Sequence, residues 1–138
     1  MKKVFALLFA TSVVVWSCSK DQKVVKDLEG DWNLTAETVD GVATPDSELV
    51  GTTYSFTKCK VKKGDCDGSL SSPDPSKGTF TLPFTYNIQD DGETININYS
   101  FGGLTTTNKG TIVEQTDDKF VYSYTEDSEK IVETLTKK

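Results

Sequence analysis

Apolar and polar residues alternate most regularly along residues 78–88, whose sequence is GTFTLPFTYNI. Every second residue is apolar, and the shared face carries Phe80, Leu82, Phe84, Tyr86 and Ile88. A repeat of two is typical of a β-strand with one buried face. Turn residues follow at 89–92 (QDDG), and alternation resumes along residues 93–101 (ETININYSF). The pattern therefore predicts a β-hairpin, with Pro83 at a sheet edge or a bulge.

Shorter segments rich in β-forming residues fill the rest of the chain. Further strands are predicted at residues 31–39, 50–61, 105–116, 119–125 and 129–136. Short connections at residues 117–118 and 126–128 join the last three strands and favour antiparallel strands that are neighbours in sequence and in the sheet. Residues 67–77 (DGSLSSPDPSK) are predicted to be the one long loop. The expected fold is all-β, with seven or eight antiparallel strands in an up-and-down barrel or, alternatively, a β-sandwich.

The N-terminal segment has a different character. Lys2 and Lys3 precede an uncharged run at residues 4–16 (VFALLFATSVVVW), and the small residue Ser17 ends it. This order is typical of a secretory signal peptide. The apolar run would span about 20 Å as a helix, less than the ~30 Å hydrocarbon core, so a permanent transmembrane helix is not expected.

Cys18 directly follows the apolar run. Residues 15–18 (VWSC) resemble the lipobox of bacterial lipoproteins, in which an aliphatic, a variable and a small residue precede a cysteine that receives diacylglycerol. The chain has three cysteines, an odd number for an exported protein, and lipidation of Cys18 leaves the other two as a pair. The expected organisation is a signal peptide at residues 1–17, a lipidated N-terminus and tether at 18–27, and a β domain at 28–138.

The residues behind Cys18 carry two further expectations. Val24, Val25 and Leu28 are predicted to form one face of a short helical turn that ends near Gly30. Lys20 and Asp21 resemble the charged export signal of surface lipoproteins in Bacteroidetes-type bacteria. The resemblance implies an outer-membrane lipoprotein displayed on the cell surface, with the periplasmic face of the outer membrane as the alternative.

Charge and composition narrow the range of functions. Without residues 1–17 the chain has 13 lysines against 21 acidic residues, a net charge of −8, and it contains no arginine or histidine. Phosphate backbones repel such a domain, so no nucleic-acid partner is expected, and membrane attachment depends on the lipid anchor. Histidine is the usual base near neutral pH, and the acidic pairs at 90–91 and 117–118 lie in predicted turns. We therefore expect a non-enzymatic protein without a cofactor or metal.

Cys59 and Cys66 enclose six residues that include Lys62, Lys63 and Gly64. If the chain reverses direction there, the two cysteines face each other at a separation compatible with a disulfide. A metal site is the alternative, but no histidine accompanies the two thiols, and a redox pair is normally closer in sequence. A structural disulfide is therefore predicted.

Residues 28–35 (LEGDWNLT) place a Gly-x-Trp motif at the start of the first strand. This motif resembles the lipocalin signature, and residues 85–100, 110–125 and 130–137 resemble the final strands of lipocalin-like domains in lipoproteins of Bacteroidetes-type bacteria. The resemblance implies a lipocalin-like barrel in which Trp32 closes one end. Lipocalins usually pack an arginine across this tryptophan, and here Lys130 or Lys137 would have to take that place.

Aromatic residues on the predicted inner faces supply the functional hypothesis. A barrel that binds a small apolar or amphipathic ligand would line its open end with aromatic side chains. The candidates are Tyr54, Phe56, Phe84, Tyr86, Tyr99 and Phe101. The alternative is a non-enzymatic surface or accessory module that binds another protein, which the anchor and the acidic exterior would suit.

Overall fold

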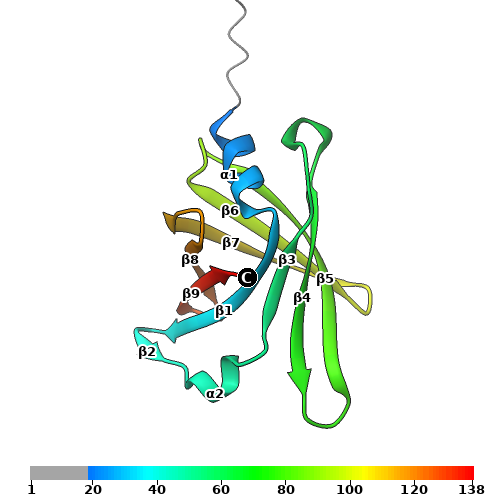
Figure 1. Ribbon diagram of the computed structural model, residues 1–138, viewed down its shortest axis with the longest axis vertical. Coiled ribbons are helices and arrows are strands. Elements are labelled where there is room, and N and C mark those ends of the chain that lie inside the picture. The colour runs from blue at the N-terminus through cyan, green and yellow to red at the C-terminus, as the bar shows by residue number, and fades with distance from the viewer. Residues whose placement is uncertain (1–18) are drawn as a thin grey trace, which may run out of the picture.

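The computed structural model describes residues 19–138, which form a barrel with a short helix across one end (Figure 1). The predicted signal peptide at residues 1–17 and the predicted lipidation site Cys18 lie outside the described residues. Within residues 19–138, no helix is long and apolar enough to cross a membrane.

Nine strands and three short helical segments make up the described chain. The strands are β1 (Gly30–Val39), β2 (Val42–Ala43), β3 (Thr53–Phe56), β4 (Cys66–Asp74), β5 (Gly78–Gln89), β6 (Thr94–Phe101), β7 (Leu104–Gln115), β8 (Lys119–Glu126) and β9 (Glu129–Lys137). The helical segments are α1 (Lys20–Leu28), α2 (Asp46–Leu49) and the 3-10 turn η1 (Val61–Lys63).

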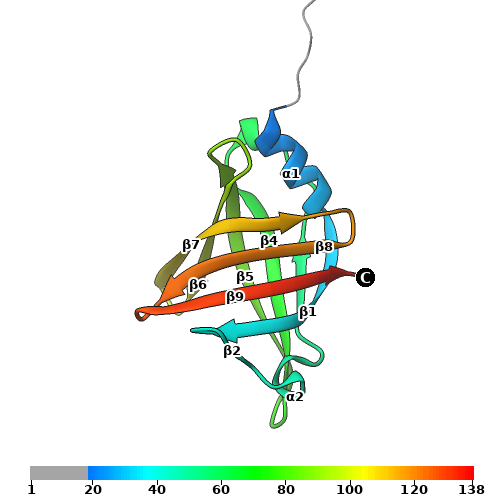
Figure 2. The same cartoon turned by 90° about the vertical axis from the view of Figure 1, so that its left-hand side faces the viewer.

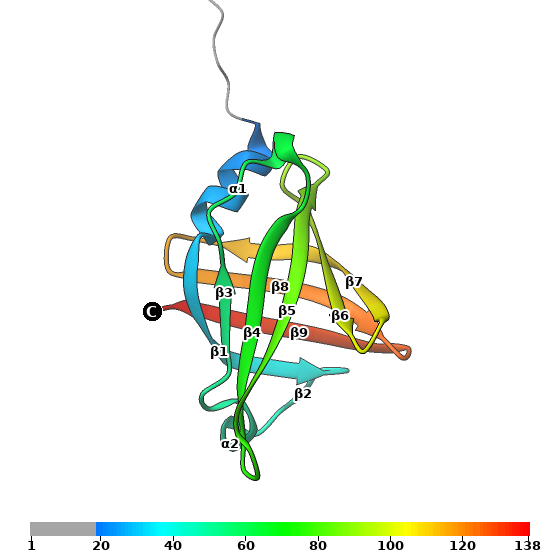
Figure 3. The same cartoon turned by 90° about the vertical axis from the view of Figure 1, so that its right-hand side faces the viewer.

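The sheet closes on itself through antiparallel pairing of β1 with β9. From β3 to β9 each strand pairs with the next, and β1 pairs with β3, so eight strands form a closed barrel. Strand β2 pairs only with the last residues of β1. Figures 2 and 3 show the two sides of this barrel. The structure confirms the all-β antiparallel barrel and rules out the alternative sandwich.

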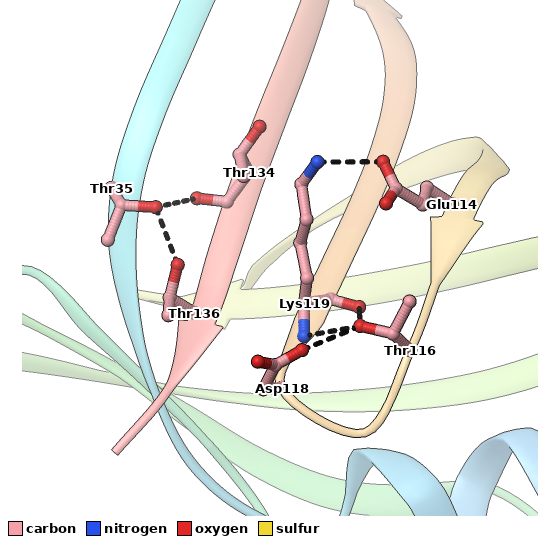
Figure 4. A network of polar contacts seen from close by, with 7 residues as sticks. All are labelled: Thr35, Glu114, Thr116, Asp118, Lys119, Thr134 and Thr136. Carbon is pink, nitrogen blue, oxygen red and sulfur yellow. Dashed lines mark hydrogen bonds and ion pairs between the residues drawn. The ribbon is translucent and has the colours of Figure 1, made fainter.

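The register of β1 and β9 shows which side chains face outward. Thr35 on β1 hydrogen-bonds to the Thr134 carbonyl and to the Thr136 hydroxyl on the outer surface (Figure 4). Because side chains alternate along a strand, the residues next to these threonines on β9 face inward. Glu133 and Leu135 are indeed almost completely buried.

Residues 67–77 were predicted to be a loop, and this prediction is wrong because most of them form β4. This strand pairs with β5 along its whole length, from Cys66 opposite Tyr86 to Asp74 opposite Gly78. On its other side it pairs with β3 only as far as Ser71. Pro73 comes after Ser71 on β4 and has no β3 residue beside it, so its missing backbone N–H costs no hydrogen bond with β3.

The predicted tether also differs from the structure, because residues 20–28 form helix α1. The Ser19 hydroxyl accepts a hydrogen bond from the backbone N–H of Gln22 and caps the helix N-terminus. Val24, Val25 and Leu28 are buried on one face, so the predicted apolar face is present but belongs to a longer helix. Ser19 is thus the one described residue that precedes the helix.

Candidate functional site

Inward-facing residues change from buried to exposed along the barrel. On β5 the exposed fraction is 4% for Ile88 and 3% for Phe84 but 45% for Phe80. On β6 it rises from 0% for Ile95 to 67% for Phe101. The barrel interior is therefore packed at the end near α1 and meets solvent at the opposite end. We call the latter the open end and define it by the exposed residues Phe80, Phe101 and Leu104.

Helix α1 and Trp32 close the packed end. The Trp32 indole is fully buried, and its Nε1–H donates a hydrogen bond of 2.7 Å to the carbonyl of Leu28, the last residue of α1. The Lys137 ammonium lies 5.1 Å from the centre of the Trp32 ring, within the range of a cation–π contact. Lys137, of the two lysines considered, thus occupies the place that the lipocalin resemblance gives to an arginine.

Polar contacts hold α1 in this position. The Asp21 carboxylate accepts a hydrogen bond of 2.7 Å from the backbone N–H of Gly92 in the β5–β6 turn. The Gln22 side chain donates to the Cys59 carbonyl and accepts from the Val61 backbone N–H, each at 3.0 Å. The helix is therefore attached to two separate parts of the barrel.

Cys59 and Cys66 form the predicted disulfide, with their Cα atoms 5.5 Å apart. Cys66 is buried at the start of β4, while Cys59 lies in the segment after β3. The bond closes the segment that contains η1 and contacts Gln22. Its role here is structural, since it fixes the support of the helix that covers the packed end.

The six predicted ligand-binding aromatics all face the interior, but the structure places them in different surroundings. Tyr54, Phe56, Phe84 and Tyr86 are almost fully buried, and each ring centre lies 5.1–6.3 Å from at least two of the others. Tyr99 is partly buried and packs against Phe84. Phe101 is exposed and contacts Phe80 at 6.2 Å. Only the last two therefore lie where solvent reaches the inner wall.

A buried carboxyl group lies in the middle of the barrel. Glu133 is 4% exposed, and three tyrosine hydroxyls donate hydrogen bonds to it. Oε2 accepts from Tyr54 at 2.9 Å and from Tyr122 at 2.5 Å, and Oε1 accepts from Tyr124 at 3.0 Å. We call Glu133, Tyr54, Tyr122 and Tyr124 the carboxyl–tyrosine cluster.

Burial is the largest influence on the pKa values of this cluster. It raises the pKa of Glu133 above its usual value, and the nearby Glu37 carboxylate raises it further. The hydrogen bonds from the three tyrosines act in the opposite direction and lower it. Burial likewise raises the pKa of Tyr54 and Tyr122, and the Glu133 charge adds to both. The cluster thus resists the gain of negative charge.

The carboxyl–tyrosine cluster was not predicted from the sequence, although a pattern in β9 could have revealed it. In residues 129–137 (EKIVETLTK), Ile131, Glu133 and Leu135 share the inward face. A charged residue between two apolar residues on a buried face requires partners. The sequence alone could not identify these, because Tyr54 lies on β3, 79 residues away from Glu133.

A shallow depression of about 290 Å³ lies where β5 and β6 separate. Their pairing ends at Phe84 opposite Tyr99, so Pro83 has no β6 neighbour, as expected for an edge position. The depression is lined by Asp67, Gly68, Pro83, Phe84, Thr85, Asn98 and Ser100. Most of these residues alternate with the inward-facing ones, so the depression belongs to the outer wall.

Comparison with solved structures places this geometry among known folds. A lipocalin-like protein from Bacteroides uniformis matches with a TM-score of 0.56 and 16% sequence identity, over 81% of this chain and 99% of that one. The fold is lipocalin-like. A point mutant of the fluorescent protein UnaG matches with a TM-score of 0.43 and 14% identity, over 83% of this chain and 98% of its own. No protein-family model and no curated protein sequence matches the chain.

Proposed function

We propose that this protein binds a small apolar or amphipathic molecule at the open end of its lipocalin-like barrel. The observation that carries the proposal is the rise in exposure along the inner wall, from 3% at Phe84 to 45% at Phe80. Apolar side chains that face a barrel interior and still meet solvent are suited to cover the apolar part of a ligand.

The packing limits how far such a ligand enters. Tyr54, Phe56 and Tyr86 fill the interior between the open end and Trp32. A ligand would therefore lie between the exposed wall residues and the carboxyl–tyrosine cluster, without reaching α1. This depth suits a small molecule or one end of a longer chain.

The proposed setting is the bacterial cell envelope, with lipidated Cys18 as the membrane anchor. Because α1 begins two residues after Cys18, the packed end of the barrel would lie next to the anchor and the open end away from it. The barrel would then present its ligand site toward the aqueous compartment. We propose binding without catalysis as its activity.

The proposal is tested with N-phenyl-1-naphthylamine, an uncharged probe whose fluorescence increases in apolar surroundings. The full chain with Cys18→Ser, which removes the acylation site, should bind the probe saturably, and Phe101→Ser should weaken binding. Val113→Ser serves as the matched control, because Val113 is 61% exposed on β7 and far from the open end. Equal binding by all three proteins would contradict the proposal. Native mass spectrometry of the purified protein should detect a co-purified small molecule.

Binding of another protein is the second candidate function. Its support is the exposure of Val42 and Val50, which add to the apolar residues of the open end. Probe binding that is lost in Phe101→Ser favours the small-molecule function. A barrel that binds no probe but associates with an envelope protein through the same residues favours this alternative.

A further inference from the structure

The carboxyl–tyrosine cluster has hydrogen-bond partners but no counter-charge. Three phenol hydroxyls, of Tyr54, Tyr122 and Tyr124, lie within 3.0 Å of the Glu133 carboxyl oxygens and donate hydrogen bonds to them. Within residues 19–138, the ion pairs are Lys23–Asp27 and Lys119–Glu114, and neither involves Glu133. A buried carboxyl is stable when it holds its proton or when a cation pairs with it, so a cation beside Glu133 would favour the ionised form.

The charged and titratable groups that face Glu133 are all acidic or phenolic. They come from each neighbouring part of the wall: Glu37 on β1, Tyr54 on β3, Tyr99 on β6, and Tyr122 and Tyr124 on β8. Glu126, at the end of β8, adds negative charge beside Tyr99 and Tyr124. An anionic head group would be repelled here, whereas an ammonium group would be attracted.

The cluster is also within reach of the proposed ligand. Tyr124 is 9% exposed, more than the other members, and Tyr99 beside it is only partly buried. Once a phenol has donated its hydrogen to Glu133, its oxygen retains lone pairs that accept hydrogen bonds. A ligand that entered past Phe101 would therefore meet the less buried Tyr99 and Tyr124 first, with the Glu133 carboxyl behind them.

We infer that the carboxyl–tyrosine cluster is the polar end of the ligand site, and that it selects amphipathic amines whose ammonium group pairs with Glu133. The inference rests on the proposed function, since it names the ligand class of the same site. The apolar body of the amine lies along Phe80, Phe101 and Leu104, and its head group points toward Tyr124. The bound amine supplies the counter-charge, so binding favours the ionised carboxyl and releases a proton to solvent.

The test measures displacement of N-phenyl-1-naphthylamine from the full chain carrying Cys18→Ser. Octylammonium, octanol and octanoate serve as competitors, because they share one alkyl chain and differ only in head group. A hydrogen-bonded ion pair should let octylammonium compete at a concentration lower by about tenfold than octanol, with octanoate the weakest. Glu133→Gln should reduce the preference for octylammonium to less than about threefold.

Glu114→Gln is the matched control. It removes the same unit of charge from the outer surface, where Glu114 pairs with Lys119 (Figure 4), and should retain the preference. Tyr124→Phe keeps the carboxyl and removes one hydroxyl, so it tests the site even if Glu133→Gln fails to fold. It should lower the preference for octylammonium. Calorimetry in buffers of different ionisation enthalpy should detect proton release with octylammonium and none with octanol.

Each other outcome has a defined meaning. Equal or better displacement by octanol or octanoate overturns the inference and leaves the proposed function standing. A preference for octylammonium that persists in folded Glu133→Gln, or is unchanged in Tyr124→Phe, also overturns it. Failure of the unsubstituted barrel to bind the probe overturns the proposed function and the inference together.

Discussion

Glu133 lies inside the barrel because strand alternation leaves it no other direction. Ile131 and Leu135, two residues to either side, are buried against the core, so the side chain between them faces inward as well. Burial of an unpaired carboxylate is costly, and tyrosine hydroxyls from β3 and β8 offset part of that cost. The fold therefore determines that residue 133 faces inward, but it does not require a carboxyl group at this position.

The first prediction concerns how stability depends on pH. The pKa of Glu133 is raised by burial above 4.5 in the folded chain, so above pH 4.5 the unfolded chain releases this proton first. Stability from this group is thus fully present below pH 4.5 and is lost as pH rises through the folded pKa. In Glu133→Gln this loss should disappear, so the free energy of unfolding, measured with urea between pH 4 and 9, should fall less than in the unsubstituted chain.

Glu114→Gln provides the comparison for this measurement, because Glu114 is half-exposed on the outer wall. Its stability curve should run parallel to that of the unsubstituted chain. If Glu133→Gln also runs parallel, the carboxyl of Glu133 does not hold its proton in the folded state as inferred.

At the scale of elements, the strands with strict alternation were predictable and the irregular ones were not. Residues 78–88 and 93–101 repeat apolar residues at every second position, and they form β5 and β6 as expected. Strand β4 was missed because the serines and prolines of residues 67–77 are typical of loops. Its extended form is stabilised by pairing with β5, a tertiary effect that composition does not reveal.

Helix α1 was only partly predictable for the same reason. An isolated helix of this length is unstable in water, so its stability must come from the barrel. The contacts of Asp21 with Gly92 and of Gln22 with Cys59 join residues far apart in sequence. The six aromatic candidates were expected to line an open barrel end, but the sequence could not separate Tyr54 in the packed interior from Phe101 at the open end.

The second prediction tests α1 as the cover of the packed end. Leu28, the last residue of α1, is fully buried, and Leu28→Ala should lower the free energy of unfolding by about 2–5 kcal/mol through lost burial and a cavity. Lys26→Ala, at an exposed position of the same helix, should change it by less than about 0.5 kcal/mol. Urea unfolding followed by Trp32 fluorescence measures both. Similar values for the two variants would show that α1 does not cover the core.

The third prediction concerns the disulfide that supports α1. The bond closes a short loop, and its reduction should lower the free energy of unfolding by roughly 2–3 kcal/mol because the unfolded chain gains entropy. The barrel should still fold, since the β5–β6 hairpin lies outside the loop. Urea unfolding with and without dithiothreitol measures the difference. In the double variant Cys59→Ala, Cys66→Ala, dithiothreitol should not change the free energy of unfolding. If it lowers that free energy as much as in the unsubstituted protein, the effect does not come from this disulfide.

At the scale of the whole molecule, the position of α1 determines how the barrel would face the proposed anchor. Helix α1 lies against one end of the barrel (Figures 1 and 3). The exposed aromatic residues Phe80 and Phe101 belong to the opposite, open end. Ser19 is the one residue between Cys18 and α1, so the barrel would lie close to the membrane rather than on a long tether. The acidic domain adds no attraction to anionic head groups, so the proposed membrane attachment would depend on the lipid.

The fourth prediction concerns membrane attachment through the proposed lipid on Cys18. Cys18→Ala should abolish incorporation of labelled fatty acid and shift the protein from the membrane fraction to the soluble fraction. Cys59→Ala should leave both measurements unchanged, because Cys59 is engaged in the disulfide. Continued labelling of Cys18→Ala would show that another residue carries the lipid or that the protein is not a lipoprotein.

The last prediction concerns which side of the outer membrane the barrel faces. The sequence resemblance assigns Lys20 and Asp21 to a surface-export signal, but Asp21 also holds α1 to Gly92. Surface display predicts that an antibody to the barrel labels intact cells.

Two variants separate an effect on export from an effect on folding. Asp21→Asn keeps a side-chain oxygen that can accept the hydrogen bond from the Gly92 backbone N–H. Gly92→Ala strains the turn, because φ there is +83° and a Cβ would lie 2.9 Å from the Val24 side chain. If an export system recognises Asp21, Asp21→Asn should lose surface labelling while its unfolding midpoint stays unchanged. Gly92→Ala should lower the unfolding midpoint of the purified protein. Labelling that requires permeabilised cells, in the unsubstituted protein, would place the barrel on the periplasmic face and leave Asp21 with the structural role alone.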